Sequence, residues 1–252
     1  MLTGDYFKQV VYGYWARRFE CNREDFARPG TLVIKEKELA ETRKTHIYQI
    51  DRMSIVRTFP ILAKQAGLPD GCDRDFASLS VNRLQELAAD KFKVEVESTL
   101  LDFFLDPEDF VPFPVGKDFT THRLYAESEN SILLSLFEAC TEEDLDNADI
   151  NIEEPDPVIY GIFSGKKLVA YASFRYWDDV IADMGVLIHP DYRGQGLGKA
   201  VISVLCKWCI ENDVVPMYRV FNDHPYSIRI PQALGFQDLV IIETLKIMGK
   251  VG

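Results

Sequence analysis

Apolar residues follow two different spacings along the second half of the chain. Apolar runs or alternating positions typical of β-strands fall at residues 121–126, 158–163, 168–176, 180–188 and 217–221. Helical spacing, with apolar residues three and four positions apart, falls instead at residues 128–140 and 197–208. Thr141 followed by Asp144 has the pattern of a capping box and predicts a further helix start. With a short helix after Asn222 and a final strand after Gly235-Phe236, residues 119–252 are predicted to fold in the order β-α-α-β-β-β-α-β-α-β.

The first half of the chain also carries regular patterns. Residues 6–14 predict an amphipathic helix, 31–34 a strand, 46–59 a stretch of β-type alternation and 82–90 another helix. Three prolines punctuate residues 107–118 and remove backbone donors there, which is typical of a linker. We therefore expect an N-terminal α+β lobe at 1–106, a Pro-rich linker at 107–118 and a second domain at 119–252.

Composition bounds the class of protein. The chain has 252 residues, of which 47% are hydrophobic, so it can bury one large core or two ordinary ones. No run of 18 apolar residues is present, and Asp5 and Lys8 interrupt the place where a signal peptide needs apolar residues. The five cysteines have irregular spacing, and Cys206 and Cys209 fall inside a predicted helix, where core packing explains them better than zinc. We expect a cytoplasmic protein with reduced cysteines and no metal.

The net charge is −12, which argues against nucleic acid or an anionic membrane as a partner, because phosphate contacts need a basic surface. Acidic residues are dense shortly after the first predicted helix of the second domain. They are Glu142, Glu143, Asp144, Asp146, Asp149, Glu153, Glu154 and Asp156. One hypothesis is that they attract a cationic small-molecule or peptide amine. The alternative is an acidic surface that only keeps the protein in solution.

A glycine-rich loop follows the strand at 180–188. Gly194, Gly196 and Gly198 alternate with other residues directly before a predicted helix, and Arg193 and Lys199 add positive charge. Such a loop can bring backbone N–H groups and a helix N-terminus to a phosphate. Spacing excludes a P-loop, because Ala200 stands where Ser or Thr is needed, and the G-x-G-x-G order differs from the dinucleotide fingerprint.

The segment Arg193-Gly194-Gln195-Gly196-Leu197-Gly198 resembles the signature of the GNAT acetyltransferase superfamily. The Gly235-Phe236 pair and the predicted element order agree with that family over residues 119–252. The resemblance implies an α/β fold in which helices flank a mixed central sheet. For the N-terminal α+β lobe, a degenerate copy of the same fold is one alternative, although no second glycine signature is present.

The resemblance also implies a binding site for acetyl-CoA. The pyrophosphate would lie on the N–H groups of the glycine loop, and the pantetheine arm would run along the preceding strand. A backbone N–H of Leu187 or Ile188 would polarise the thioester carbonyl. The cofactor-binding residues implied are Val186, Leu187, Ile188, Arg193, Gly194, Gln195, Gly196, Leu197, Gly198, Lys199 and Asn222.

Catalytic residues follow less directly from the resemblance. Many family members protonate the leaving thiolate with a Tyr four residues before the Gly of the Gly-Phe pair, but Pro231 stands there. Tyr226 is the nearest replacement, and Asp183 is the one acid on the central strand that could serve as base, although its register is one residue off the family position. The sequence thus predicts an acetyl-CoA-dependent N-acetyltransferase that lets a primary amine attack directly in a ternary complex. The alternative is a catalytically weak acetyl-CoA sensor or interaction module.

Overall fold

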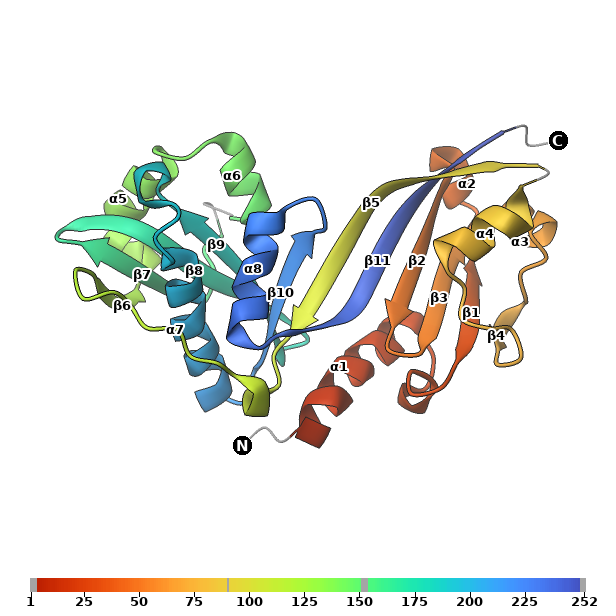
Figure 1. Cartoon of the computed structure of the whole chain (residues 1–252), viewed down its shortest axis with the longest axis horizontal. Coiled ribbons are helices and arrows are strands. Elements are labelled where there is room, and N and C mark those ends of the chain that lie inside the picture. Colours follow the sequence, from red (N-terminus) through yellow and green to blue (C-terminus); the bar gives the residue numbers. More distant parts are fainter. Residues whose placement is uncertain (1–3, 90, 151–153, 250–252) are drawn as a thin grey trace. The chain divides into compact units, whose positions relative to one another are not determined.

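The computed structural model describes residues 4–89, 91–150 and 154–249, which form two compact units (Figure 1). The first unit contains Met1–Val10, Phe103–Arg219 and Pro225–Gln237, and the second contains Val11–Asp102, Val220–His224 and Asp238–Gly252. Each unit is therefore assembled from segments that are distant in sequence. The division into 1–106, 107–118 and 119–252 stays a prediction.

The first unit is built on a five-strand mixed sheet in the order β10-β9-β8-β7-β6. Its strands are β6 (Thr120–Leu124), β7 (Val158–Ser164), β8 (Lys167–Trp177), β9 (Ile181–Ile188) and β10 (Val215–Phe221). Neighbours from β6 to β9 pair antiparallel, and β10 pairs parallel to β9. The long apolar runs of β7 and β8 fit this position, because central strands are covered on both faces.

Helices cover both faces of this sheet. They are α5 (Ala126–Phe137), α6 (Glu142–Asn147), α7 (Leu197–Glu211) and α8 (Pro225–Leu234). Leu187 of β9 packs in one cluster with Leu133 and Phe137 of α5, whereas the next residue, Ile188, approaches Gly198 of α7. Since successive strand residues point to opposite faces, α5 and α7 lie on opposite sides of β9.

The predicted element order of residues 119–252 is confirmed, as is the α/β fold with a mixed sheet flanked by helices. The capping box at Thr141 is present: its hydroxyl accepts from the Asp144 N–H, and the Asp144 carboxylate accepts from the Thr141 N–H. The helix predicted at 128–140 begins earlier, at Ala126, and ends at Phe137. Cys206 and Cys209 are fully buried in α7, as expected for core residues.

The strands of the second unit form a sheet in the order β4-β1-β3-β2-β11-β5. Its strands are β1 (Gly30–Lys35), β2 (Lys44–Ile50), β3 (Met53–Thr58), β4 (Gly71–Asp73), β5 (Lys93–Phe104) and β11 (Gln237–Met248). The stretch predicted as alternating at 46–59 is thus two strands, which turn at Asp51 in a left-handed conformation. The strand β5 was not predicted, although Lys93-Val-Glu-Val-Glu97 has clear alternation.

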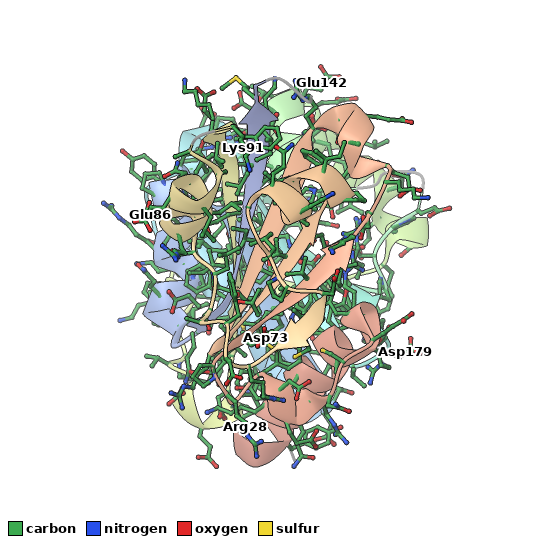
Figure 2. All side chains as sticks on the ribbon, turned by 90° about the vertical axis from the view of Figure 1, so that its right-hand side faces the viewer. Arg28, Asp73, Glu86, Lys91, Glu142 and Asp179 are labelled. Carbon is green, nitrogen blue, oxygen red and sulfur yellow. The ribbon has the colours of Figure 1, made fainter. Side chains whose placement is uncertain are left out.

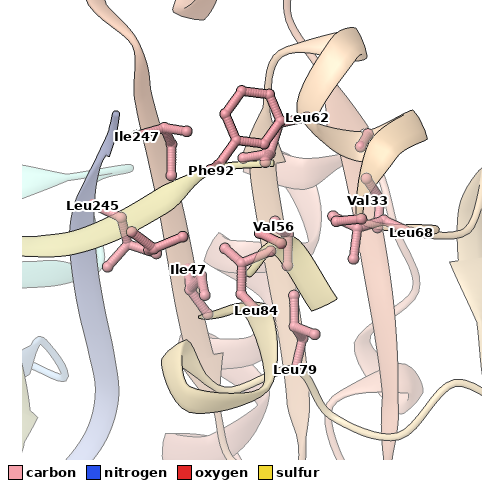
Figure 3. Packing of buried hydrophobic residues seen from close by; sticks show 14 of the residues in the cluster. Val33, Ile47, Val56, Leu62, Leu68, Leu79, Leu84, Phe92, Leu245 and Ile247 are labelled. Atoms are coloured by element: carbon pink, nitrogen blue, oxygen red, sulfur yellow. The ribbon is translucent and has the colours of Figure 1, made fainter. Parts of the chain in front are cut away.

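Helices pack on both faces of the second sheet. They are α1 (Gly4–Phe19), α2 (Leu39–Thr42), α3 (Pro60–Gln65) and α4 (Val81–Ala88). Figure 3 shows Leu62 of α3 and Leu84 of α4 in one buried cluster with Ile47 and Val56 of the sheet. Trp15 and Phe19 of α1 instead contact Tyr48, whose side chain points to the opposite face from Ile47.

The charged residues Arg28, Glu86, Lys91 and Glu142 are exposed at the surface (Figure 2). Within the described ranges, no helix is both long enough and apolar enough to cross a bilayer.

Candidate active site

Strands β9 and β10 separate part-way along their length. β9 pairs with β8 from Ile181 to Ile188, but its described pairing with β10 runs only from Ile181 opposite Val215 to Met184 opposite Tyr218. Both strands continue beyond that point. Residues 185–188 of β9 therefore present one backbone edge to which no described strand pairs. An extended ligand can bind to such an edge by strand-like hydrogen bonds.

The glycine loop leads from this edge into α7. Gly194 and Gly196 have φ angles of 77° and 80°, in the left-handed region that favours glycine. Gly196 is also the N-cap of α7, and no side chain caps the helix there. The first N–H groups of α7 are consequently left for a ligand, and an anion is the natural one.

Gly198 serves a different purpose in the same loop. A Cβ atom on this residue would stand 3.0 Å from Cδ1 of Ile230 in α8. The glycine thus lets α7 and α8 approach closely, which the sequence pattern alone did not distinguish from ligand approach.

The two cations of the loop have different partners. Arg193 Nη2 lies 2.8 Å from Oδ2 of Asp144 in α6, and its Nε donates to the Ile188 carbonyl at 3.4 Å. Burial raises the pKa of Asp144, but the Thr141 N–H and the Arg193 guanidinium outweigh it and hold the pKa below its usual value. Lys199 instead places its Nζ 4.8 Å from the ring centre of Phe113. Lys199 is thus the loop cation better placed to meet an incoming anion.

A buried polar chain lies on the other face of the sheet. The Ser173 hydroxyl of β8 donates to Oδ2 of Asp156 at 2.5 Å, and Ser173 is opposite Gly185 of β9. The Tyr171 hydroxyl shares a hydrogen bond with the same Ser173. Burial raises the pKa of Asp156, although Ser173 and Arg175 oppose the shift. A carboxyl group of this kind takes up a proton more readily than an exposed one.

Arg175 connects the polar chain to the end of α6. Its Nη2 donates to the Asp149 carbonyl at 2.6 Å, its Nη1 lies 3.0 Å from the Asp149 carboxylate, and its Nε lies 3.9 Å from Asp156 Oδ1. Asp144, Asp149 and Asp156 therefore have partners within the protein. Of the other predicted acceptor-binding acids, Glu142, Glu143, Asp146 and Glu154 are exposed, and Glu153 lies outside the described residues.

The residues predicted for catalysis lie in different surroundings. Tyr226, in the first turn of α8, is 81% exposed. The guanidinium carbon Cζ of Arg229 lies over its ring, 5.5 Å from the ring centre. It is one helical turn before Ile230, so it shares the face that approaches Gly198. Pro231 is buried inside α8. Asp183 is half-buried on β9, in register with Arg175 and on the same strand face as Leu187.

Asn222, predicted to bind the cofactor, lies in the turn after β10. Its backbone N–H donates to the Thr99 carbonyl at 2.9 Å, and its side chain is exposed. Its role in binding stays a prediction.

Two residues near this site, Ser173 and Phe113, were missed in the sequence, and Asp156 was named only as one of the acids expected to attract the acceptor. Ser173 interrupts the apolar run from Leu168 to Phe174, which is a usable signal of a buried polar contact. Asp156 stands in a Pro-Asp-Pro sequence and Phe113 in the predicted linker, where nothing in their spacing indicates their contacts.

Residues 122–236 match the model of the acetyltransferase (GNAT) family. This segment is a GNAT acetyltransferase domain. Members of this family typically bind acetyl-CoA. Within the described part of the chain, no group of three or more His, Cys, Asp or Glu residues is arranged to hold a metal ion.

Several solved structures are similar to the chain. A GNAT-family protein from Novosphingobium aromaticivorans is 21% identical, covers 63% of this chain and 68% of its own, and gives a TM-score of 0.44. A GNAT acetyltransferase from Colwellia psychrerythraea is 18% identical over 68% of this chain and 62% of its own, with a TM-score of 0.49. A Drosophila protein is 14% identical over 98% of this chain and 91% of its own, with a TM-score of 0.43. No curated protein sequence matches the chain.

Proposed function

We propose that the protein is an acetyl-CoA-dependent N-acetyltransferase that acts on a primary amine of a small molecule or peptide. The observation that carries this proposal is the separation of β9 from β10 after Met184 and Tyr218, directly before the loop with left-handed Gly194 and Gly196. An open strand edge followed by an uncapped helix N-terminus suits a ligand with an extended amide arm and a pyrophosphate.

The described residues fit acetyl-CoA in three places. The backbone edge at Val186, Leu187 and Ile188 would pair with the amides of the pantetheine arm. The N–H groups from Gly194 to Lys199 would hold the pyrophosphate, and the Lys199 ammonium would add charge attraction. When bound, acetyl-CoA supplies the thioester carbonyl that an amine attacks.

The protein's own groups would act on that carbonyl and on the amine. A backbone N–H of Leu187 or Ile188 would donate to the carbonyl oxygen as negative charge develops there. Asp183 would take a proton from the acceptor ammonium, and Tyr226 would hold a proton for the departing sulfur. Positioning of both reactants in one complex would supply much of the rate, without a covalent intermediate on the protein.

The acceptor is proposed to be cationic. Asp144, Asp149 and Asp156 pair with Arg193 or Arg175, and the exposed carboxylates of Glu142, Glu143 and Asp146 would attract it. Exposed carboxylates raise the local concentration of a cation more than they bind it tightly.

A second candidate function is an acetyl-CoA sensor with little turnover. Two observations favour it: Pro231 is buried where many family members carry the proton-donating Tyr, and the proposed replacement Tyr226 is largely exposed. Both functions require acetyl-CoA binding, and turnover distinguishes them.

Calorimetric titration with acetyl-CoA, followed by a free-thiol assay with spermidine, kanamycin and a dipeptide, tests the proposal. We expect binding, with thiol release that depends on one class of amine. Binding without release from any amine would favour the sensor, and absence of binding would refute both functions.

A pair of glycine variants makes the binding test specific to the loop. Gly196→Val should abolish acetyl-CoA binding. Gly165→Val is the matched control, because Gly165 also has a left-handed φ, of 59°, but lies in the turn between β7 and β8. Equal losses of binding in both variants would mean that strain, and not the loop, is responsible.

A further inference from the structure

The segment expected to be a linker is firmly attached to the first unit. The Val111 N–H donates to the Leu234 carbonyl at the end of α8 at 3.0 Å, and the Phe113 N–H donates to the Ser203 hydroxyl of α7 at 2.8 Å. Asp109 accepts a hydrogen bond from the Gln237 side chain at 2.5 Å. The segment therefore lies across α8 and α7 in a defined conformation.

These contacts bring the Phe113 ring to the glycine loop. Its Cε1 atom stands 3.3 Å from the position that a Cβ atom of Gly196 would occupy, and the Lys199 ammonium lies 4.8 Å from the ring centre. The ring is only partly buried. An aromatic surface is thus held in place beside the uncapped N-terminus of α7.

We propose that Phe113 stacks on the adenine of coenzyme A, so that the segment before the GNAT domain completes the cofactor site. This inference rests on the proposed function, which places the pyrophosphate on the N–H groups of this same N-terminus. The adenosine is attached directly to that pyrophosphate, and an adenine ring gains free energy by stacking on an aromatic side chain. Lys199, next to the ring, is placed to meet the phosphates on the adenosine side.

Two features argue for this role over ordinary packing. The matched GNAT segment begins at residue 122, so Phe113 lies outside the segment that the family model describes. Its backbone is already fixed by Ser203, so stacking costs little further ordering of the protein.

The test compares Phe113→Ala with the wild type for three ligands: coenzyme A, 3′,5′-ADP, which carries only the adenosine end, and 4′-phosphopantetheine, which lacks it. We expect Phe113→Ala to weaken binding of coenzyme A and 3′,5′-ADP about tenfold and to leave 4′-phosphopantetheine unchanged. Phe113→Trp should restore adenosine-end binding. Val111→Ala, at an exposed position on the same segment, should bind all three like the wild type.

The outcomes separate this inference from the proposed function. Unchanged coenzyme A affinity in Phe113→Ala, or equal weakening of 4′-phosphopantetheine, would overturn the stacking role. If Phe113→Ala unfolds, Phe113→Leu with a circular-dichroism check provides the same comparison without a large cavity. If the wild type itself binds no coenzyme A, the proposed function fails, and the inference fails with it.

Discussion

Gly185 of β9 lies directly beneath the carbonyl oxygen of Ala148, so closely that a Cβ atom on residue 185 would overlap that oxygen. The residue after α6 therefore packs directly on β9 at Gly185, which is the first residue of the backbone edge at 185–188 to which no described strand pairs. No side chain can project from this position on the face that α5 and α6 cover. The acids near this position on that face are Asp183, two residues earlier, and Asp156, which reaches Ser173 opposite Gly185.

Replacement of Gly185 by Ala should destabilise the protein, because the added methyl group collides with backbone and not with a flexible side chain. Overpacking of this kind costs about 1–3 kcal/mol. The expected result is a fall in Tm of about 2–10 °C, measured by thermal unfolding. Gly13→Ala is the control: its Cβ would meet only ordinary contacts within a helix, so its Tm should stay equal or rise. Equal stability of Gly185→Ala and wild type would show that α6 moves aside freely.

Gly198 and Ile230 should be coupled in stability, because the Cβ of an alanine at 198 would crowd Cδ1 of Ile230. Ile230→Val removes that Cδ1 atom. A double-mutant cycle on chemical denaturation should therefore give a coupling free energy of about 0.5–1 kcal/mol in favour of the double variant. Strict additivity of the two changes would indicate that α7 and α8 do not touch at this point.

Asp156→Asn should change how stability depends on pH. Burial raises the pKa of Asp156, so the folded state binds this proton more tightly than the unfolded state. Such a group favours the folded state most at low pH, and that advantage is lost as pH rises through the folded pKa. We expect the wild type to lose stability relative to Asp156→Asn from about pH 4 upward.

Thermal unfolding of both proteins between pH 4 and pH 7 measures this difference. Glu142→Gln, which removes an exposed charge from α6, controls for the change in net charge. A difference that grows in favour of the wild type with rising pH would contradict the burial of Asp156.

Tyr226→Phe should lower kcat at least about tenfold if its phenol protonates the leaving thiolate, because general acids contribute at least this much. Its exposure predicts unchanged Tm and unchanged acetyl-CoA affinity. Tyr125→Phe is a matched control, since Tyr125 is also exposed and has an arginine over its ring. The Cζ atom of Arg123 lies 5.4 Å from the ring centre. An unaltered kcat in Tyr226→Phe would remove Tyr226 from the reaction.

Local patterns in the sequence were enough to predict the order of elements in the GNAT domain. The capping box at Thr141 and the apolar stripe of α7 depend on residues a few positions apart, and local spacing reports such contacts directly. The alternating glycines of the loop were recognised for the same reason, although their left-handed φ angles were not predicted. Gly198 shows the limit of local patterns. Glycine is needed there because a Cβ atom would crowd Ile230, which lies far along the chain.

Contacts between distant residues were the part that could not be predicted. Asp156 reaches Ser173 only because the segment after α6 returns to β8, and Phe113 reaches Gly196 only because its segment is bonded to α7 and α8. Neither contact leaves a periodic signal. The alternation in β5 was a usable signal, whereas the pairing of β11 with β2 is a property of the tertiary fold.

The pairing of β2 with β11 also sets an order of events during synthesis. Residues 44–50 leave the ribosome long before residues 237–248, and at bacterial to eukaryotic elongation speeds the interval is about 10–40 s. Throughout that time the β2 edge that β11 will occupy stays open to other strands, including those of a neighbouring nascent chain. An N-terminal fragment that ends at the proline-rich segment lacks β11 and leaves this edge of β2 open, so the N-terminal half should be produced together with the final strand.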